Sequence, residues 1–144
     1  MNFDIKFDFQ RRDRLGLIEA IWGQDKSIDQ LERLCGNVLS KNEVVFITRI
    51  NSEKANYLLD LYDDARFHEE ANCLLIGKNF NKIITNKKVA IISGGSSDLA
   101  VTLEAQLALE IYGVNCQSFI DVGVAGLHRL MSCLLYTSDA ADDL

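Results

Sequence analysis

The sequence lacks the features that would place it in a membrane, a secreted or a nucleic-acid-binding class. No apolar run reaches the roughly 18–20 residues that a bilayer-spanning helix needs. The N-terminus alternates charged and aromatic residues and has no apolar core of a signal peptide. Basic residues are in deficit, with 15 Lys and Arg against 21 Asp and Glu and a formal net charge of −6, whereas a nucleic-acid surface needs a basic stripe. We therefore expect a cytoplasmic protein that binds neither nucleic acid nor membrane.

The cysteines form no C-x-x-C pair and have no nearby histidine that would complete a zinc site. We expect free, mostly buried thiols at Cys35, Cys73, Cys116 and Cys133, and we predict no metal ligands. Hydrophobic residues make up 48% of the chain and charged residues 25%, the balance of a globular protein. A length of 144 residues suits one domain, or a small domain with part of a second.

Residues 1–80 show the alternating patterns of a small N-terminal α/β domain. Ser27 is followed three residues later by Gln30, which is the pattern of a capping box at a helix start. Asn51 precedes a second helical pattern in the same way, and His68 lies in a polar stretch that we expect at the surface. The predicted elements are helices over 28–40 and 52–61 and strands over 44–47 and 73–76.

A segment rich in Asn and Lys, residues 78–88, marks the boundary to a second domain over 81–132. Its pattern predicts a strand over 89–93, a tight loop, a helix over 98–112 that stops at Gly113, and a strand over 114–120. This is a βαβ unit, so the two strands are expected to be parallel.

Residues 133–144 differ in kind from the rest of the chain. The run from Cys133 to Asp143 back-translates to a string that looks like the adapter of transposase-based sequencing libraries. We therefore predict that 133–144 is an artefactual tail, that the second domain is truncated near Ser132, and that Cys133 has no role.

The loop after the first strand of the second domain is a candidate anion site. Glycines at the carboxyl end of a strand let the backbone approach a ligand, and the free N–H groups of the following helix favour phosphate. The loop matches neither the dinucleotide nor the Walker pattern, so a plain turn capped by Ser97 or Asp98 remains an alternative. The candidate residues are Gly94, Gly95, Ser96, Ser97 and Asp98.

A second glycine-containing loop, 121–129, follows the next parallel strand and should face the same crevice. Gly126 again allows close backbone approach. His128 can exchange a proton near neutral pH, and Arg129 can bind phosphate or carboxylate through two N–H groups. The alternative is a helix start with a solvated His-Arg pair.

These residues resemble a known family. VAIISGGSSDLA at 89–100 resembles the opening strand and Ser-Asp loop of the class I aminoimidazole ribonucleotide carboxylases, which have the PurE fold, and His128-Arg129 resembles their His-Arg pair. The sequence is more similar to the PurE-like LarB family of nickel-pincer nucleotide biosynthesis, above all in DVGVAGLHRL at 121–130. Gly95 stands where the purine enzymes carry serine, and Gly126-Leu127 where they carry Ser-Ala; both differences favour LarB.

The resemblance implies a flavodoxin-like, PurE-type parallel sheet after the small N-terminal domain, and assembly into a homo-oligomer through that sheet domain. It implies carboxylation of the pyridinium ring of nicotinic acid adenine dinucleotide, followed by phosphoanhydride hydrolysis that releases AMP. Asp98 and His128 would be catalytic; Gly94, Gly95, Ser96, Ser97, Asp98, Gly126 and Arg129 would bind the substrate.

The resemblance implies carbon dioxide or bicarbonate as co-substrate and no tightly bound cofactor, and it leaves a Mg²⁺ requirement open. The nucleophilic cysteine of the family belongs to the distal half of its domain, so the 144-residue chain is expected to be inactive. The alternatives are an aminoimidazole ribonucleotide carboxylase or mutase of purine biosynthesis and, in another class, a non-catalytic nucleotide-binding module.

Overall fold

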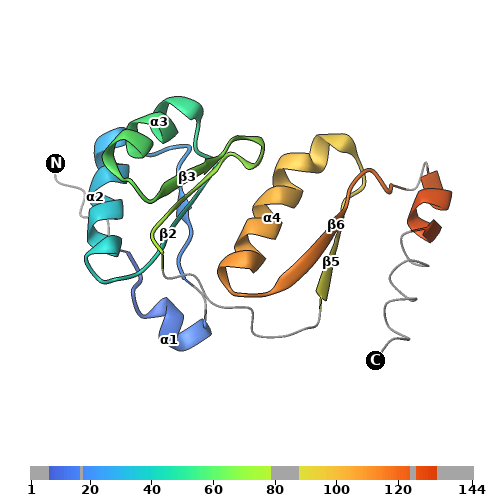
Figure 1. Cartoon of the computed structure of the whole chain (residues 1–144), viewed down its shortest axis with the longest axis horizontal. Coiled ribbons are helices and arrows are strands. Elements are labelled where there is room, and N and C mark those ends of the chain that lie inside the picture. The colour runs from blue at the N-terminus through green and yellow to red at the C-terminus, as the bar shows by residue number, and fades with distance from the viewer. Residues whose placement is uncertain (1–6, 17, 79–87, 124–125, 133–144) are drawn as a thin grey trace. The chain divides into compact units, whose positions relative to one another are not determined.

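Two units make up the chain, Met1–Lys82 and Ile83–Leu144 (Figure 1). The computed structural model describes residues 7–16, 18–78, 88–123 and 126–132. In each unit helices pack on strands, which confirms the predicted α/β class. Most of the Asn- and Lys-rich boundary segment and the whole of 133–144, with Cys133, lie outside the described residues.

A four-stranded mixed sheet forms the first unit. Its order is β1-β2-β4-β3, with β1 parallel to β2 and β4 antiparallel to both of its neighbours. The strands are β1 (Ile21–Trp22), β2 (Val45–Thr48), β3 (Ala65–His68) and β4 (Cys73–Ile76). The sequence patterns predicted β2 to within one residue and β4 as observed.

The sequence patterns did not predict the strand β3, which also corrects the expected position of His68. Its Ala-Arg-Phe-His sequence carries no run of β-branched residues, yet it pairs along its whole length with β4. His68 is half-buried rather than exposed, and it lies opposite Cys73 in this pairing. A 3₁₀ turn, Glu69–Ala71, and Asn72 in the left-handed conformation (φ 52°) reverse the chain between the two strands.

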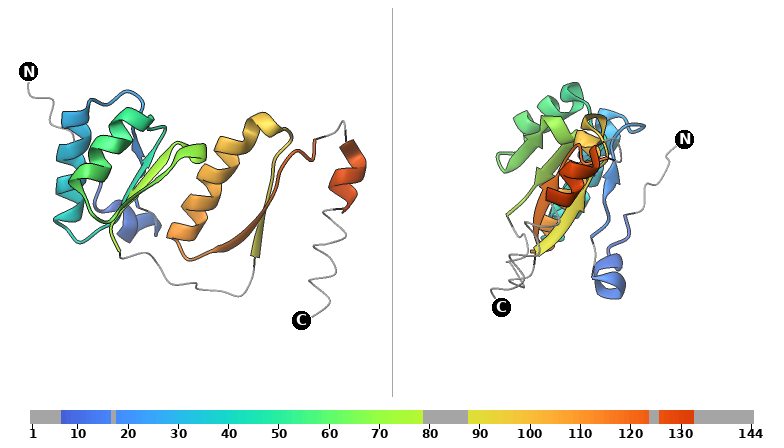
Figure 2. Two further views of the ribbon diagram at one scale, coloured as in Figure 1. Left: turned by 45° about the horizontal axis from the view of Figure 1, so that its top comes forward. Right: turned by 90° about the vertical axis from the view of Figure 1, so that its right-hand side faces the viewer.

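Two helices lie on one face of this sheet (Figures 1 and 2). They are α2 (Ile28–Leu39) and α3 (Ser52–Leu61), both as predicted to within one residue, and a short helix, α1 (Arg11–Leu15), precedes β1. The capping box of α2 is complete: the Gln30 backbone N–H donates to Ser27 Oγ (3.2 Å) and the Ser27 N–H donates to Gln30 Oε1 (2.9 Å). Asn51 Oδ1 accepts from the Lys54 N–H (3.0 Å) at the start of α3.

The core of the first unit joins the two helices to alternate residues of the central strands. Burying these side chains supplies the main stabilising free energy of the unit. The fully buried side chains include Leu31, Cys35 and Val38 from α2, Ala55 and Leu58 from α3, and Val45, Ile47, Leu74 and Ile76 from β2 and β4.

The second unit is a βαβ unit, as predicted. β5 (Lys88–Ile92) and β6 (Asn115–Phe119) run parallel and pair from Lys88↔Asn115 to Ile92↔Phe119. α4 (Leu99–Ile111) connects them and buries Leu107 and Ile111. Gly113 (φ 70°) ends the helix, and the N–H groups of Gly113 and Val114 donate to the Glu110 and Leu109 carbonyls, so the predicted glycine stop is confirmed.

The loop predicted before this helix is more ordered than expected, because Ser96–Asp98 forms a 3₁₀ turn that leads directly into α4. Residues 127–132 are helical as well. Within the described ranges, no helix is both long and apolar enough to cross a membrane.

Candidate functional site

The loops that follow β5 and β6 meet at one edge of the two-stranded sheet. The Ser93 N–H donates to the Phe119 carbonyl (2.9 Å), and the Val122 N–H donates to the Ser93 carbonyl (3.0 Å). Just beyond, Gly123 lies so close to Gly94 that a Cβ on it would be 2.3 Å from the Gly94 carbonyl oxygen. The structure therefore brings together the two glycine-containing loops that the sequence placed after neighbouring strands.

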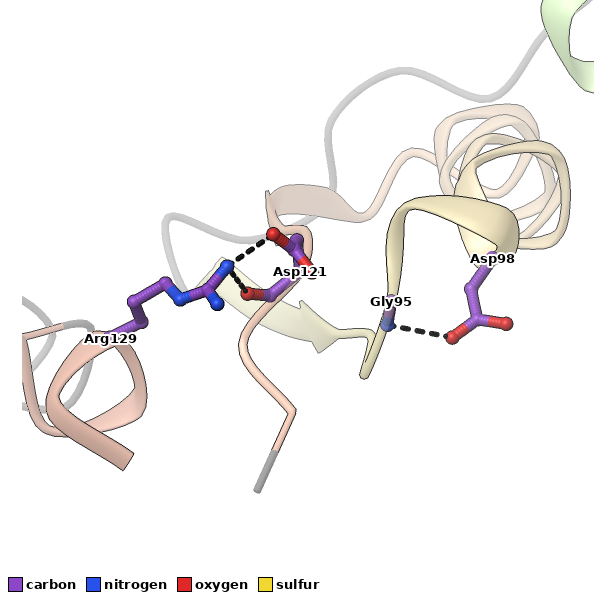
Figure 3. A network of polar contacts seen from close by, with 4 residues as sticks. All are labelled: Gly95, Asp98, Asp121 and Arg129. Atoms are coloured by element: carbon purple, nitrogen blue, oxygen red, sulfur yellow. Dashed lines mark hydrogen bonds and ion pairs between the residues drawn. The ribbon is translucent and has the colours of Figure 1, made fainter. Parts of the chain in front are cut away.

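Asp98 organises the first loop. Its carboxylate accepts a hydrogen bond from the Gly95 N–H (3.0 Å), and its own N–H donates to the Gly95 carbonyl (3.0 Å) (Figure 3). The Thr102 hydroxyl donates to the Asp98 carbonyl one turn into α4 (2.9 Å). Asp98 thus closes the turn before the helix, which is the plain role that the sequence analysis left open for it.

The turn itself carries polar side chains. Ser96, Ser97 and Asp98 are exposed, so a ligand can reach their hydroxyl and carboxylate oxygens. Ser93, at the end of β5, is 9% exposed, and its buried Oγ has no hydrogen-bond partner among the described residues. Because a buried hydroxyl is usually paired, this unused group at the sheet edge is suited to a ligand atom.

Arg129 is held by a residue that the sequence analysis did not select. Its Nη1 donates to the Asp121 carbonyl oxygen (2.9 Å) and pairs with the Asp121 carboxylate (Figure 3). Asp121 takes the left-handed conformation (φ 62°) two residues after the end of β6. Its place as the first polar residue after a parallel strand is the signal that would have found it.

Figure 3 also shows that Arg129 and Asp98 take part in two separate contacts. No hydrogen bond or ion pair within the described part of the chain joins either of them to the side chain of His128, which is exposed on the helical turn at 127–132. His128 is therefore exposed to solvent, whereas the guanidinium of Arg129 is held by Asp121. Two of the residues in this loop, 124 and 125, lie outside the described part.

Gly126 is buried next to the Arg129 side chain. Its N–H donates to the Gly123 carbonyl (2.9 Å), and a Cβ on it would lie 2.4 Å from Arg129 Nε. A side chain at 126 would therefore displace the guanidinium from Asp121.

The described cysteines are free thiols, as predicted. Cys35 and Cys73 are buried and Cys116 is half-buried. Burial raises the pKa of Cys35 to about 12, and burial, followed by the charge of Glu110, raises the pKa of Cys116. A nucleophilic cysteine needs a lowered pKa, so neither of these two groups is an activated nucleophile. Among the described residues, no three His, Cys, Asp or Glu side chains gather to hold a metal ion.

Comparisons with known proteins agree with this architecture. A family model described as the LarB/PurE-like N-terminal domain matches residues 3–78, most of the first unit. An uncharacterized protein of Methanocaldococcus jannaschii is 32% identical over 136 residues, which are 90% of this chain and 53% of that protein. The similarity thus extends through both units, and the chain spans about half the length of this relative.

Proposed function

This chain belongs to the LarB/PurE-like family, a carboxylase-related family, and on that premise we propose that it contributes a nucleotide-binding edge to a carboxylase acting on nicotinic acid adenine dinucleotide. The observation that carries the proposal is the meeting of the two glycine loops at Gly94 and Gly123. At this point the two loop backbones, the start of α4 and the Ser93 hydroxyl lie at one end of the sheet. Each of them can donate hydrogen bonds to a phosphorylated ligand.

Each residue of the edge has a proposed task. Ser96 and Ser97 donate hydrogen bonds to phosphate oxygens, and the small Gly94 and Gly95 let the ligand approach the backbone. Arg129 uses Nη1 to hold Asp121, and its remaining N–H groups bind a phosphate or the ring carboxylate. Asp98, held by Gly95 at one carboxylate oxygen, and His128 stand beside the reacting ring.

The chemistry follows that of the family. A thiolate that adds to the electron-poor pyridinium ring turns it into an enamine, and the enamine carbon then attacks carbon dioxide. Loss of the ring proton and departure of the thiolate restore the aromatic ring, and water cleaves the phosphoanhydride to release AMP. Because Cys35 and Cys116 have raised pKa values and Cys73 is buried, we propose that the thiolate comes from a segment outside these 144 residues and that the 144-residue chain alone does not turn over. Proton transfer in the carboxylation step falls to Asp98 or His128.

The runner-up reaction is carboxylation of aminoimidazole ribonucleotide. The two substrates share a ribose phosphate, so the same edge would bind either of them. Gly95 and Gly126-Leu127, where the purine enzymes carry Ser and Ser-Ala, favour the pyridinium substrate. Homo-oligomer formation, a cytoplasmic location and independence from a tightly bound cofactor remain parts of the proposal, with Mg²⁺ left open.

Calorimetric titration of the chain with nicotinic acid adenine dinucleotide tests the binding site. Asp98→Ala should abolish binding, and Arg129→Lys should weaken it by about tenfold or more, because an ammonium does not reproduce the guanidinium fork and charged hydrogen bonds contribute about 1.5–3 kcal/mol. Asp60→Ala and Arg33→Lys, exposed positions in the first unit, are the matched controls and should bind like the wild type. Unchanged affinity in Asp98→Ala would refute the site assignment, and tighter binding of aminoimidazole ribonucleotide would favour the runner-up.

A further inference from the structure

The first unit carries an exposed tryptophan at the carboxyl end of its parallel strand pair. Trp22, the only tryptophan in the chain, ends β1 and is 48% exposed. It pairs in register with Thr48, the last residue of β2. The carboxyl ends of parallel strands are where open α/β sheets bind ligands, and Trp22 is at that edge of the first unit.

Two charged side chains fix the indole. The Trp22 Nε1–H donates to Asp25 Oδ2 (3.2 Å), which satisfies its single polar group. The Arg49 guanidinium carbon lies 5.7 Å from the ring centroid, within the range of a cation–π contact. The ring is therefore exposed but held in one orientation.

Arg49, which lies over the Trp22 ring, has a strained backbone conformation. It is exposed and takes the left-handed conformation (φ 54°), although its neighbours Thr48 and Ile50 are both buried. Residues other than Gly, Asn and Asp rarely adopt this conformation, and such strained residues concentrate at binding sites. The chain thus keeps an arginine over the indole where a glycine would fit without strain.

The segment after Trp22 is also built to hold it. Gly23 is buried, and a Cβ on it would lie 2.9 Å from Ile47 Cγ2. Its N–H donates to the Thr48 carbonyl (2.8 Å). Lys54, on α3, donates from Nζ to the carbonyls of Gly23 (3.0 Å) and Gln24 (2.8 Å). The loop is therefore anchored to both β2 and α3, and its exposed tryptophan is a fixed surface.

We propose that Trp22 and Arg49 form a second ligand site, which takes a planar aromatic anion of the mononucleotide class. The heteroaromatic ring of such a ligand stacks on the indole, and its phosphate pairs with the Arg49 guanidinium. α3 begins three residues after Arg49, so the N-terminal dipole of this helix adds to the attraction for the anion. This site lies in the first unit and does not depend on the function proposed for the loops of the second.

Fluorescence of the chain, excited selectively at tryptophan, reports changes in the surroundings of Trp22, because Trp22 is the only tryptophan. Titration with AMP should change the emission along a saturable curve. Adenosine, which offers only the ring, and inorganic phosphate, which offers only the anion, should each bind at least about tenfold more weakly than AMP. Absence of a saturable response to AMP would overturn the proposal, and an equal response to phosphate alone would overturn the stacking of the base.

Arg49→Gly separates ligand binding from folding. Glycine adopts φ 54° without strain, so the urea midpoint of the variant should equal or exceed that of the wild type, while its affinity for AMP falls by at least about tenfold. Arg33→Ala, which removes an exposed arginine from α2, is the control and should bind AMP like the wild type. A lower midpoint together with unchanged affinity would show that Arg49 only supports the fold, and would refute the site.

One further variant keeps the two proposals apart. In Asp98→Ala, where the proposed function expects loss of dinucleotide binding, the Trp22 response to AMP should persist. Loss of both in this variant would show that the fluorescence reports the loops of the second unit, and would overturn the second site. A Trp22 surface that binds no mononucleotide but is covered in a complex with another protein would likewise contradict the proposal.

Discussion

Gly123 lies so close to Gly94 that a single added methyl group should lower the stability of the second unit. In Gly123→Ala the new Cβ would lie 2.3 Å from the Gly94 carbonyl oxygen and 3.2 Å from its carbon. Both are backbone atoms, so no side chain can rotate away to make room. The two loops must therefore separate by about 1 Å to restore van der Waals contact.

The magnitude follows from what this separation strains. The hydrogen bond from the Val122 N–H to the Ser93 carbonyl (3.0 Å) lies one residue from the clash and would lengthen with it. Overpacking by a methyl group in a close-packed region costs about 1–3 kcal/mol. We therefore expect the free energy of unfolding of the second unit to fall by about 1–3 kcal/mol, and binding at the edge to weaken as well.

Gly94→Ala is the matched control, because it adds a methyl group to the other side of the same contact. There the nearest atoms to the new Cβ, Asp98 Oδ2 and Gly123 Cα, are both 3.9 Å away, an ordinary contact. This variant should be within about 0.5 kcal/mol of the wild type, as expected for a substitution that creates no clash.

Hydrogen exchange followed by mass spectrometry measures the effect for each unit separately. A loss of about 1–3 kcal/mol should accelerate exchange of the β5 and β6 amides by about 5- to 150-fold in Gly123→Ala. Peptides from α2 and β2 in the same spectra provide an internal reference that should not change. Exchange at the wild-type rate in Gly123→Ala would refute the close approach of the two loops and the site geometry built on it.

Two further predictions concern the first unit, whose unfolding in urea can be followed through Trp22. Ser27→Ala removes the acceptor for the Gln30 N–H in the capping box, so the free energy of unfolding should fall by about 1 kcal/mol. Ser40→Ala, at the exposed other end of α2, should lower the free energy of unfolding by less. Equal losses in the two variants would contradict the capping argument. Burial raises the pKa of Cys35 from 9.0 to about 12, so the folded chain holds the thiol proton more tightly than the unfolded chain does. The stability of the first unit should therefore be retained below pH 9 and fall as the pH rises from about 9 towards 12. The fall should be shallower in Cys35→Ala but unchanged in Cys116→Ala, and an equal slope in all three proteins would show that Cys35 is not its cause.

Local signals in the sequence were sufficient for most helices and strands. The capping box of Ser27 and Gln30, the cap at Asn51 and the stop at Gly113 each act within a few residues, so their pattern can be read without knowledge of the fold. The parallel pairing of β5 and β6 also followed from the sequence, because two strands joined by one helix can pair in few ways.

The strands β1 and β3 were not predictable in this way. β1 has only two residues, and β3 has a polar pattern, so both owe their strand conformation to the neighbours with which they pair. β1 pairs with β2 from across the whole of α2, and β3 is held by the turn at Asn72. Strand propensity is a weak signal where pairing partners decide the conformation.

For the candidate site, the sequence by itself determined which loops stand at the edge of the second sheet and which residue types they present. Only the tertiary structure decided how these residues are used: Asp98 closes its own turn, Arg129 is held by Asp121, and His128 is left exposed. It also brought Arg49 over Trp22, a contact between residues far apart in the chain. The physical reason is that such contacts depend on the path of the backbone between the partners, on left-handed residues such as Asp121 and Arg49, and on space that neighbouring side chains leave free. None of these is encoded in the local spacing of residue types.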